Sequence, residues 1–270
     1  MLNSNHYKFF IGHKMPDFPI WENFSFYQIP NFDDKDSTSF FKSNSSNDKV
    51  FGEYASLFSI KNDLSRAAEG DTLITICQYR RFVFNRKLGR KSKTMPWCMV
   101  LSHDEMVNLN IKEEYLPLSK NSFLIGSPIN IKSILEQYSE YHYIRDLLKF
   151  TSILIDLELL TNAEALNFLN QQYVIPAPSC GTFPLAAFIE IFDLLELAAN
   201  GFWNNGYRPY SDLYQCRVIG FLLERLNSFL LISYVKNNSL KIGELYGVTT
   251  MALPKNATSI DVKKGYVENR

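Results

Sequence analysis

The stretch 72–82, Thr-Leu-Ile-Thr-Ile-Cys-Gln-Tyr-Arg-Arg-Phe, decides the fold of this 270-residue chain. Its first six residues are mostly apolar or β-branched, a composition typical of a buried strand. The run then ends in polar and basic side chains, so the strand is expected to carry two guanidiniums at its carboxyl end, in the order Gln78-Tyr79-Arg80-Arg81. Ligands of open α/β sheets bind at that edge, and the planar guanidinium suits phosphate or carboxylate. The stretch therefore predicts an anionic ligand; the alternative is one arginine paired with a carboxylate and the other solvated.

The composition indicates a globular protein without an overall electrostatic preference. Hydrophobic residues make up 46% of the chain, enough for a substantial core. Basic and acidic residues number 28 each, so any attraction to nucleic acid or to an anionic membrane must be local. The cysteines form no Cys-x-x-Cys pair, which predicts reduced thiols in a cytosolic protein. No secretory signal or membrane-spanning segment is expected, and peripheral membrane attachment stays open.

Hydrophobic spacing divides the chain into alternating strands and helices. Strands are expected at 7–12 and 24–29, a helix at 52–69, and the strand within 72–82 directly after it. This alternation predicts an α/β fold with a largely parallel sheet and helices on its faces. Further strands are expected at 97–102, 122–129 and 172–178, and a turn at 179–182. Helices are expected at 185–200 and 212–234, and the stretch 131–160 has a mostly helical pattern, either unbroken or broken once. Residues 1–253 should form one domain and residues 254–270 a polar tail.

A concentrated basic segment follows the arginine-bearing strand. Phe82 and Phe84 are interleaved there with seven basic residues, namely Arg80, Arg81, Arg86, Lys87, Arg90, Lys91 and Lys93. A solvated loop, a diphosphate site and a contact with an anionic membrane surface are all compatible with this pattern. Nucleic acid is disfavoured, because a nucleic-acid-binding domain usually carries its positive excess on more than one loop.

Two predicted helices carry polar groups that could do chemistry. Tyr138, His142 and Asp146 fall at i, i+4 and i+8, so they are expected to share one helix face. Asp146 could fix the tautomer of His142, and such a pair can act as a general base; an exposed polar stripe is the alternative. Arg217 and Glu224 are two turns apart in a strongly apolar helix, within reach of a common ligand or of each other.

Glycine at position 220 interrupts the same apolar helix. It costs roughly 1 kcal/mol of helix stability relative to alanine, and it would let a backbone or a ligand approach closely. Several other signatures are absent from the sequence: Gly-x-Gly-x-x-Gly, the P-loop, Gly-x-Ser-x-Gly and His-Glu-x-x-His. No Asp-x-Asp ends a predicted strand, so a metal role is unsupported.

Five blocks, in the same order, make the chain similar to a bacterial family of surface-polysaccharide glycosyltransferases. The family was formerly catalogued as a domain of unknown function and includes galactofuranosyltransferases. The blocks are a strand ending in His13-Lys14, a helix from Gly52-Glu53 to Lys61-Asn62, the strand end Cys77-Gln78-Tyr79-Arg80-Arg81-Phe82, the spacing of Tyr138, His142 and Asp146, and Arg217 to Leu226. The hallmark of the family is Cys-His-Tyr-Arg-Arg followed by Tyr or Phe, so Gln78 stands in the place of its histidine.

The resemblance implies a fold like that of the nucleotide-diphospho-sugar transferases (GT-A-like), a mixed sheet flanked by helices with a helical C-terminal part. It implies transfer of galactofuranose or another hexose from a nucleotide-diphosphate donor, UDP-linked, to a bacterial surface glycan such as capsule or O-antigen. The donor would be bound by His13, Lys14, Glu53, Asn62, Gln78, Tyr79, Arg80, Arg81 and Arg217. The guanidiniums would neutralise the leaving diphosphate, a task often given to a metal. Asp146, with His142 behind it, is the first candidate for the catalytic base, and Glu224 is the second.

The implied partners are a nucleotide sugar and a glycan or lipid-linked glycan acceptor, with no nucleic acid. The implied location is the cytoplasm, with peripheral contact at the inner face of the cytoplasmic membrane through residues 80–93. A rival interpretation is a non-catalytic glycan- or nucleotide-binding protein, or an assembly subunit of a polysaccharide system. Gln78 favours it, as does the turn at Ser179-Cys180-Gly181-Thr182, where the family has an Asn-Met-Phe type of turn. A third interpretation is a membrane-surface adaptor that acts through residues 80–93.

Overall fold

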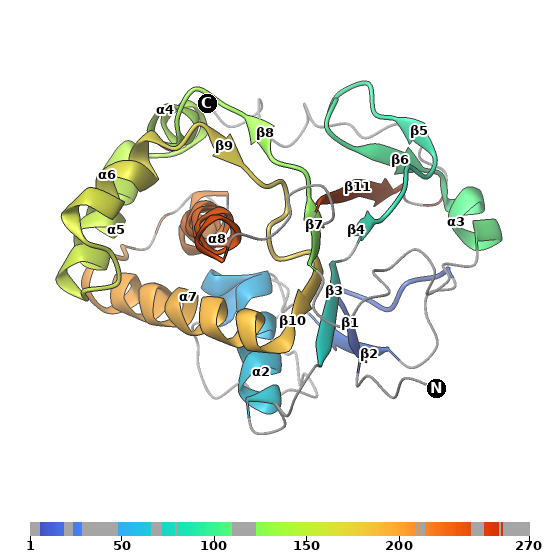
Figure 1. Ribbon diagram of the computed structural model, residues 1–270, viewed down its shortest axis with the longest axis horizontal. Helices are drawn as coiled ribbons and strands as arrows, with labels where there is room; N and C mark the ends of the chain where they lie inside the picture. The colour runs from blue at the N-terminus through green and yellow to red at the C-terminus, as the bar shows by residue number, and fades with distance from the viewer. Residues whose placement is uncertain are drawn as a thin grey trace.

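A mixed β-sheet lies at the centre of the computed structural model, which describes residues 6–18, 24–28, 48–65, 72–78, 80–109, 123–208, 210, 214–238, 246–253 and 255. Its strand order is β2-β1-β3-β10-β7-β11-β6-β5, and β4 pairs with both β11 and β3 (Figure 1). The strands are β1 (His6–Gly12), β2 (Ser25–Gln28), β3 (Leu73–Gln78), β4 (Arg81–Phe84), β5 (Arg90–Lys91), β6 (Met99–Leu101), β7 (Leu124–Gly126), β10 (Gly181–Pro184) and β11 (Tyr246–Ala252). Two short strands, β8 (Ile129–Asn130) and β9 (Tyr173–Val174), pair with each other beside the main sheet.

The sheet is less parallel than the sequence predicts. β1 runs parallel to β2 and β3, and β11 runs parallel to β6 and β7. β10 is antiparallel to β3 and β7. It begins at Gly181, inside the stretch 179–182 that was expected to be a turn. Gly181 opens β10 with a φ of 141°, and a Cβ atom there would collide with the carbonyl oxygen of Leu124. Only glycine suits this entry into the sheet.

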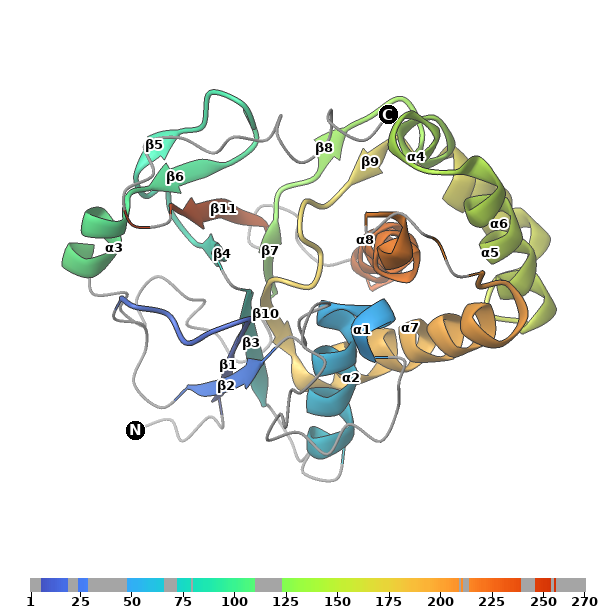
Figure 2. The ribbon, with the colours of Figure 1, turned by 180° about the vertical axis from the view of Figure 1, so that it is seen from behind.

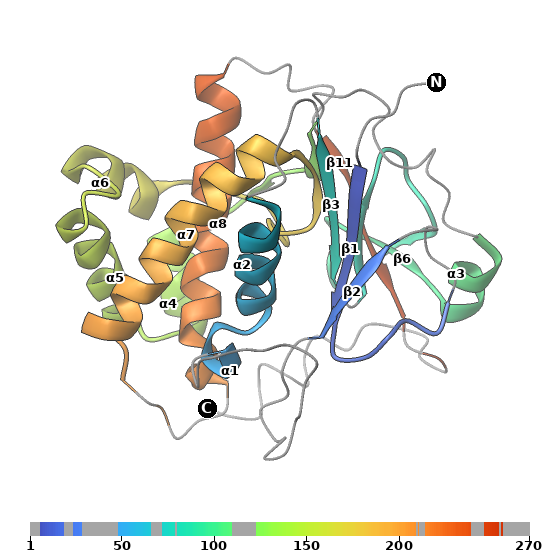
Figure 3. The ribbon, with the colours of Figure 1, turned by 90° about the horizontal axis from the view of Figure 1, so that it is seen from below.

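Alternation along the strands sends side chains to two different cores. Phe9, Ile11, Ile74 and Ile76 join the large core that the sheet shares with most of the helices. Phe10, Cys77, Phe82 and Phe84 lie in a smaller core on the opposite face, where Met106 of α3 (His103–Leu109) covers them. Figure 3 shows the sheet nearly edge-on between these two layers, with α3 alone on its side.

The helical layer is built around α8 (Val218–Asn237), which follows a single 3₁₀ turn, η2 (Gln215–Arg217). Figure 1 looks down the axis of α8, and Figure 2 shows α1 and α2 in front of α7. The remaining helices are α1 (Asp48–Phe51), α2 (Glu53–Leu64), α4 (Ile134–Tyr141), α5 (Ile144–Asp156), α6 (Asn162–Asn170) and α7 (Leu185–Asn205). Residues Gln215–Asn237 are long and apolar enough to cross a membrane, yet 67% of their apolar window is buried inside the fold. That burial is typical of a core helix.

The stretch 131–160 is helical with one break, which the pattern allowed, since α4 ends at Tyr141 and α5 begins at Ile144. Within 72–82, β3 ends at Gln78, and a second strand that was not predicted, β4, begins at Arg81. The strand β11, which lies inside the sheet between β7 and β6, was not predicted either. Of the predicted tail, 254–270, the structure describes Lys255 alone.

Candidate functional site

A hydrogen-bonded chain of polar groups lies at the carboxyl end of β3. The antiparallel register of β10 pairs Gly181 with Ile76, so Ser179 comes opposite Gln78, just beyond the last paired residues. Gln78 Nε2 donates to Ser179 Oγ at 2.5 Å, and Ser179 Oγ donates to Glu53 Oε1 at 3.3 Å. Gln78 is only 2% exposed. The buried amide of Gln78 positions Ser179, and Ser179 in turn positions Glu53. Glu53 is partly exposed.

Arg81 reaches the same region from the next strand. β4 starts at Arg81, which pairs with Gln78 across the turn. Because Phe82 and Phe84 face the α3 side of the sheet, Arg81 faces the helices. Its Nη1 atom lies 3.9 Å from Oε1 of Glu224 on α8. The two guanidiniums predicted for one strand end are thus divided, with Arg80 in the turn and Arg81 on β4.

The first turns of α8 carry the groups that meet β4. Arg217 ends the 3₁₀ turn before α8, and its guanidinium lies 5.6 Å from the ring centre of Phe221. Glu224 Oε2 accepts a hydrogen bond from Arg225 Nη1 at 3.2 Å. Arg225 is itself fixed by Gln137 Oε1 at 3.1 Å. The Glu224 carboxylate therefore lies between two arginines, one from the sheet and one from its own helix.

Glu53 is the electrostatically strained member of this group. It is the first residue of α2, after Gly52, whose φ of 60° glycine adopts without strain. Burial raises the pKa of the Glu53 carboxyl, and the nearby charge of Glu224 raises it further. The guanidiniums of Arg81 and Arg217 and the amide of Gln78 oppose this shift without cancelling it. Two carboxylates and two guanidiniums thus interact at one end of the sheet; we call Gln78, Ser179, Glu53, Arg81, Arg217 and Glu224 the polar cluster.

His142 does not form the predicted helix face with Asp146. It caps the end of α4 with extended backbone angles, so the helix is interrupted before Asp146. The imidazole stacks on Phe221 with ring centres 4.2 Å apart, and it is buried. Burial, together with the positive charge of Arg225, lowers the pKa of His142 to about 3. His142 is therefore a neutral core residue beside the polar cluster.

Asp146 has different partners from those predicted. Tyr210 donates its hydroxyl hydrogen to Asp146 Oδ2 at 2.5 Å, and Arg145 Nε lies 3.6 Å from Oδ1. Asp146 is 8% exposed. Both oxygens of this carboxylate are thus engaged by neighbours on α5 and on the connection between α7 and η2. The structure separates Asp146 from His142 and leaves Glu224 as the candidate base inside the polar cluster.

The other predicted donor-binding residues have different placements. His13 and Lys14 follow β1 at the same end of the strands as Gln78, because β1 is parallel to β3 and Ile11 pairs with Gln78. The side chains of His13 and Lys14 are both exposed. Asn62 is exposed near the far end of α2, about 14 Å along the helix axis from Glu53. Its neighbour Lys61 is buried and paired with carboxylates of α7. Tyr79 lies outside the described residues.

No protein-family model and no curated protein sequence matches this chain. A solved structure, the WbbM bifunctional glycosyltransferase in its apo form, is similar with a TM-score of 0.69 over 94% of the chain, at 16% sequence identity. The chain has a glycosyltransferase-like fold. It spans 47% of the length of the WbbM chain. The predicted mixed α/β sheet flanked by helices is thereby confirmed at the level of the fold.

Within this glycosyltransferase-like fold, sequence reasoning missed Ser179 as a site residue. The hydroxyl of Ser179 links Gln78 to Glu53, and thus joins β3, the turn before β10 and α2. Its turn was noticed only as a departure from the family pattern. The antiparallel direction of β10 is the information that would have placed Ser179 opposite Gln78.

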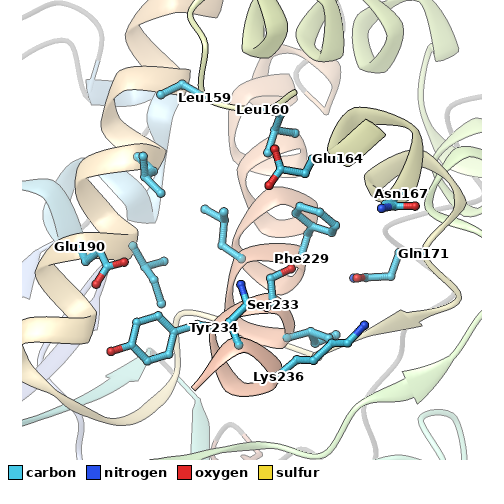
Figure 4. Close-up of a pocket in the computed structure, with 15 residues that line it drawn as sticks. Leu159, Leu160, Glu164, Asn167, Gln171, Glu190, Phe229, Ser233, Tyr234 and Lys236 are labelled. Atoms are coloured by element: carbon cyan, nitrogen blue, oxygen red, sulfur yellow. The ribbon is translucent and has the colours of Figure 1, made fainter. Parts of the chain in front are cut away.

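A separate cavity of about 570 Å³ lies between α6, α7 and the C-terminal half of α8 (Figure 4). Its polar lining includes Glu164, Asn167, Gln171, Glu190, Ser233, Tyr234 and Lys236. Ser233 is nine residues from Glu224, or about 14 Å along α8. The cavity contains none of the predicted site residues. Over the part of the chain that the structure describes, no three His, Cys, Asp or Glu side chains are grouped to hold a metal ion.

Proposed function

We propose that the chain transfers a hexose, galactofuranose or another, from a UDP-linked donor to a growing bacterial surface glycan such as capsule or O-antigen. The fold of the chain would then be of the nucleotide-diphospho-sugar transferase type (GT-A-like). The observation that carries the proposal is the pairing of Arg81 with Glu224, 3.9 Å apart, within a glycosyltransferase-like fold. It brings a cation suited to a diphosphate next to a carboxylate suited to a sugar hydroxyl.

The guanidiniums of the polar cluster would stabilise the leaving group. As the bond between the anomeric carbon and the diphosphate oxygen breaks, negative charge grows on that oxygen. Arg81 and Arg217 both act on the electrostatics of Glu53, so both lie close to the same small region. Preorganised cations in such a position lower the barrier because they need no reorganisation during the reaction. His13 and Lys14 could add positive charge from the same sheet edge.

Glu224 would take the proton of the acceptor hydroxyl. That oxygen attacks the anomeric carbon, the proton moves to the carboxylate, and the nucleoside diphosphate leaves. The Glu224 side chain is 31% exposed, so an acceptor could reach it. Asp146 is the weaker candidate, since its side chain is only 11% exposed and is less accessible to an acceptor. The acceptor would be a glycan or a lipid-linked glycan.

A second function, donor binding without transfer, is favoured by one observation. Gln78 replaces the histidine of the family hallmark and is buried against Ser179. An amide can hold Glu53 in place through Ser179, but it cannot move a proton. If the missing imidazole is essential, the chain would be a nucleotide- or glycan-binding subunit.

Ligand-observed NMR against UDP and a panel of UDP-sugars, with and without Mn²⁺, tests the proposal. We expect selective binding of one donor, its loss in Arg81→Ala, and its retention in the control Arg145→Ala, which removes an exposed arginine from α5. Absence of binding to every nucleotide under both conditions would overturn the proposal. Donor binding without transfer to glycan acceptors would favour the non-catalytic alternative.

A further inference from the structure

The basic segment 80–93 is divided by the structure into two parts with different surroundings. Arg81 faces the helices and pairs with Glu224, so it belongs to the polar cluster. Beyond β4, the basic side chains are exposed on one short stretch: Arg86, Lys87, Arg90, Lys91 and Lys93. We call these five residues the basic hairpin. Phe82, Val83, Phe84 and Asn85 separate it from Arg81, and the strand part of this segment, Arg81 to Phe84, is roughly 10 Å long at the usual rise of a strand.

The basic hairpin is held in one shape by its backbone. β5 pairs antiparallel with β6, with Arg90 opposite Val100 and Lys91 opposite Met99. Gly89 has a φ of 77°, and a Cβ atom there would collide with the carbonyl oxygen of Val100. The chain therefore packs directly on β6 between Lys87 and Arg90. The five cations are displayed by an ordered hairpin and not by an unstructured tail.

The aromatic residues interleaved with the basic ones do not share their surface. Phe82 and Phe84 are fully buried and stack on each other with ring centres 5.6 Å apart. Proteins that bind single-stranded nucleic acid combine cations with exposed aromatic rings on which bases stack. The basic hairpin offers no such ring from Phe82 or Phe84. The structure thus removes the feature of this segment that most favoured nucleic acid.

The tip between β5 and β6 adds an apolar feature to the cations. Met95 and Trp97 are each partly exposed there and pack against the small core formed by Cys98, Val100 and Met251. Backbone bonds order this tip, since Ser92 N donates to Cys98 O at 3.0 Å. Tryptophan flanked by basic residues is characteristic of segments that lie at a membrane interface.

We propose that the basic hairpin and its Met95–Trp97 tip form a docking surface for an anionic phospholipid membrane. The charge is concentrated on one edge of a chain that has no net charge, so attraction to a membrane would also orient the molecule. β4 would then connect the membrane-facing edge with the polar cluster. An acidic group near this edge is Glu105, which interacts with Arg90 and is mainly held by Ser102.

Vesicle co-sedimentation of the full chain tests the docking surface independently of any transfer activity. We compare vesicles of phosphatidylcholine with vesicles in which part of it is replaced by phosphatidylglycerol. The variant Lys87→Glu/Lys91→Glu/Lys93→Glu reverses three exposed charges of the hairpin. The matched control, Lys132→Glu/Lys149→Glu/Lys236→Glu, makes the same change of net charge on exposed positions of the helical layer. Circular dichroism establishes that both variants are folded.

We expect the wild type to bind only the anionic vesicles, and less as salt rises. Each basic residue near such a surface strengthens binding about fivefold, so the hairpin variant should bind at least about a hundredfold more weakly. The control should stay within a few-fold of the wild type. Equal binding to both vesicles, or an equal loss in the control, would overturn the proposal. So would binding to a single-stranded oligonucleotide in place of vesicles, with the same sensitivity to the hairpin variant.

Discussion

Arg81 on β4 and Glu224 on α8 approach to 3.9 Å across the boundary between the sheet and the helical layer. Their side chains are 38% and 31% exposed, so water still reaches both groups. An ion pair with this exposure contributes little to folding, typically about 0–1 kcal/mol. The arrangement is therefore easier to explain by binding than by stability, because a ligand could separate the pair at small cost.

Arg81→Gln should weaken UDP binding by about tenfold or more, the usual effect of losing a charge-assisted hydrogen bond. The free energy of unfolding should change by no more than about 1 kcal/mol. Calorimetric titration with UDP and urea unfolding measure the two quantities. A large loss of stability with unchanged UDP affinity would make the pair structural.

Glu224→Gln and Asp146→Asn distinguish the two candidate bases. If Glu224 accepts the proton of the acceptor, Glu224→Gln should lower the transfer rate by about 10²–10⁴-fold while donor binding persists. Asp146→Asn should lower it far less, since the Asp146 side chain is 11% exposed, against 31% for Glu224, and is less accessible to an acceptor. Initial rates with a saturating donor provide the comparison. A greater loss in Asp146→Asn would return the role to Asp146.

The elements that the sequence predicts well are those with strong local patterns. β1, β2 and α7 were expected close to their observed positions, because β1 and β2 are short apolar runs and the buried residues of α7 recur at helical spacing. β11 was missed because it lies near the polar end of the chain and pairs only with strands distant in sequence. The position of the break at His142 could not be predicted, because no proline or glycine marks it in the sequence. His142 follows the end of α4 and packs on Phe221, a contact made only in the folded protein.

The polar cluster shows a similar division. Glu53, Gln78, Arg81, Arg217 and Glu224 were all expected as site residues from their motifs, and the structure brings them together. Their contacts could not be predicted, because each depends on the direction of a neighbouring strand or helix. The pairing of Arg81 with Glu224 requires the turn after β3, which sends Arg81 into β4 and toward α8.

Glu53→Gln should stabilise the protein at neutral pH. The folded state raises the pKa of Glu53 above its unfolded value, so the folded protein binds this proton more tightly than the unfolded chain does. The ionised carboxylate therefore costs stability increasingly as pH rises above about 4.5. Glutamine removes that cost and keeps an oxygen for Ser179. Urea unfolding at pH 7 and at pH 4 should show a gain that shrinks at the lower pH; a loss of stability at pH 7 would contradict this account.

His142→Phe should weaken the acid sensitivity of the fold. Burial lowers the pKa of His142 to about 3, so between about pH 6.5 and pH 3 the unfolded chain binds a proton that the folded protein does not. The free energy of unfolding should therefore decrease as the pH is lowered through this window, by about 2 kcal/mol at pH 5 from His142 alone. Phenylalanine keeps the ring on Phe221 and removes the proton. Urea unfolding between pH 5 and pH 8 tests this, and an unchanged slope in the variant would assign the acid sensitivity to other groups.

Gly220→Ala tests whether the glycine in α8 makes room for a ligand. Among the described residues, a Cβ atom at position 220 would meet only the carbonyl oxygen of Phe51, at 3.9 Å, which is an ordinary contact. Alanine should therefore stabilise the helix by up to about 1 kcal/mol and raise the melting temperature by a few degrees. Gly201→Ala in α7 is the matched control, because its Cβ atom would collide with Leu157, and it should be destabilising.

The same Gly220→Ala variant should bind UDP with nearly wild-type affinity, since the added methyl group would lie at ordinary contact distance from the α1 backbone and every side chain of the polar cluster is kept. Thermal unfolding and calorimetric titration separate the two effects. A stabilised variant with unchanged UDP affinity would mean that the donor does not approach α8 at Gly220. A stabilised variant that no longer binds UDP would mean instead that the donor reaches α8 at this turn, one turn before Glu224 and beside Arg217.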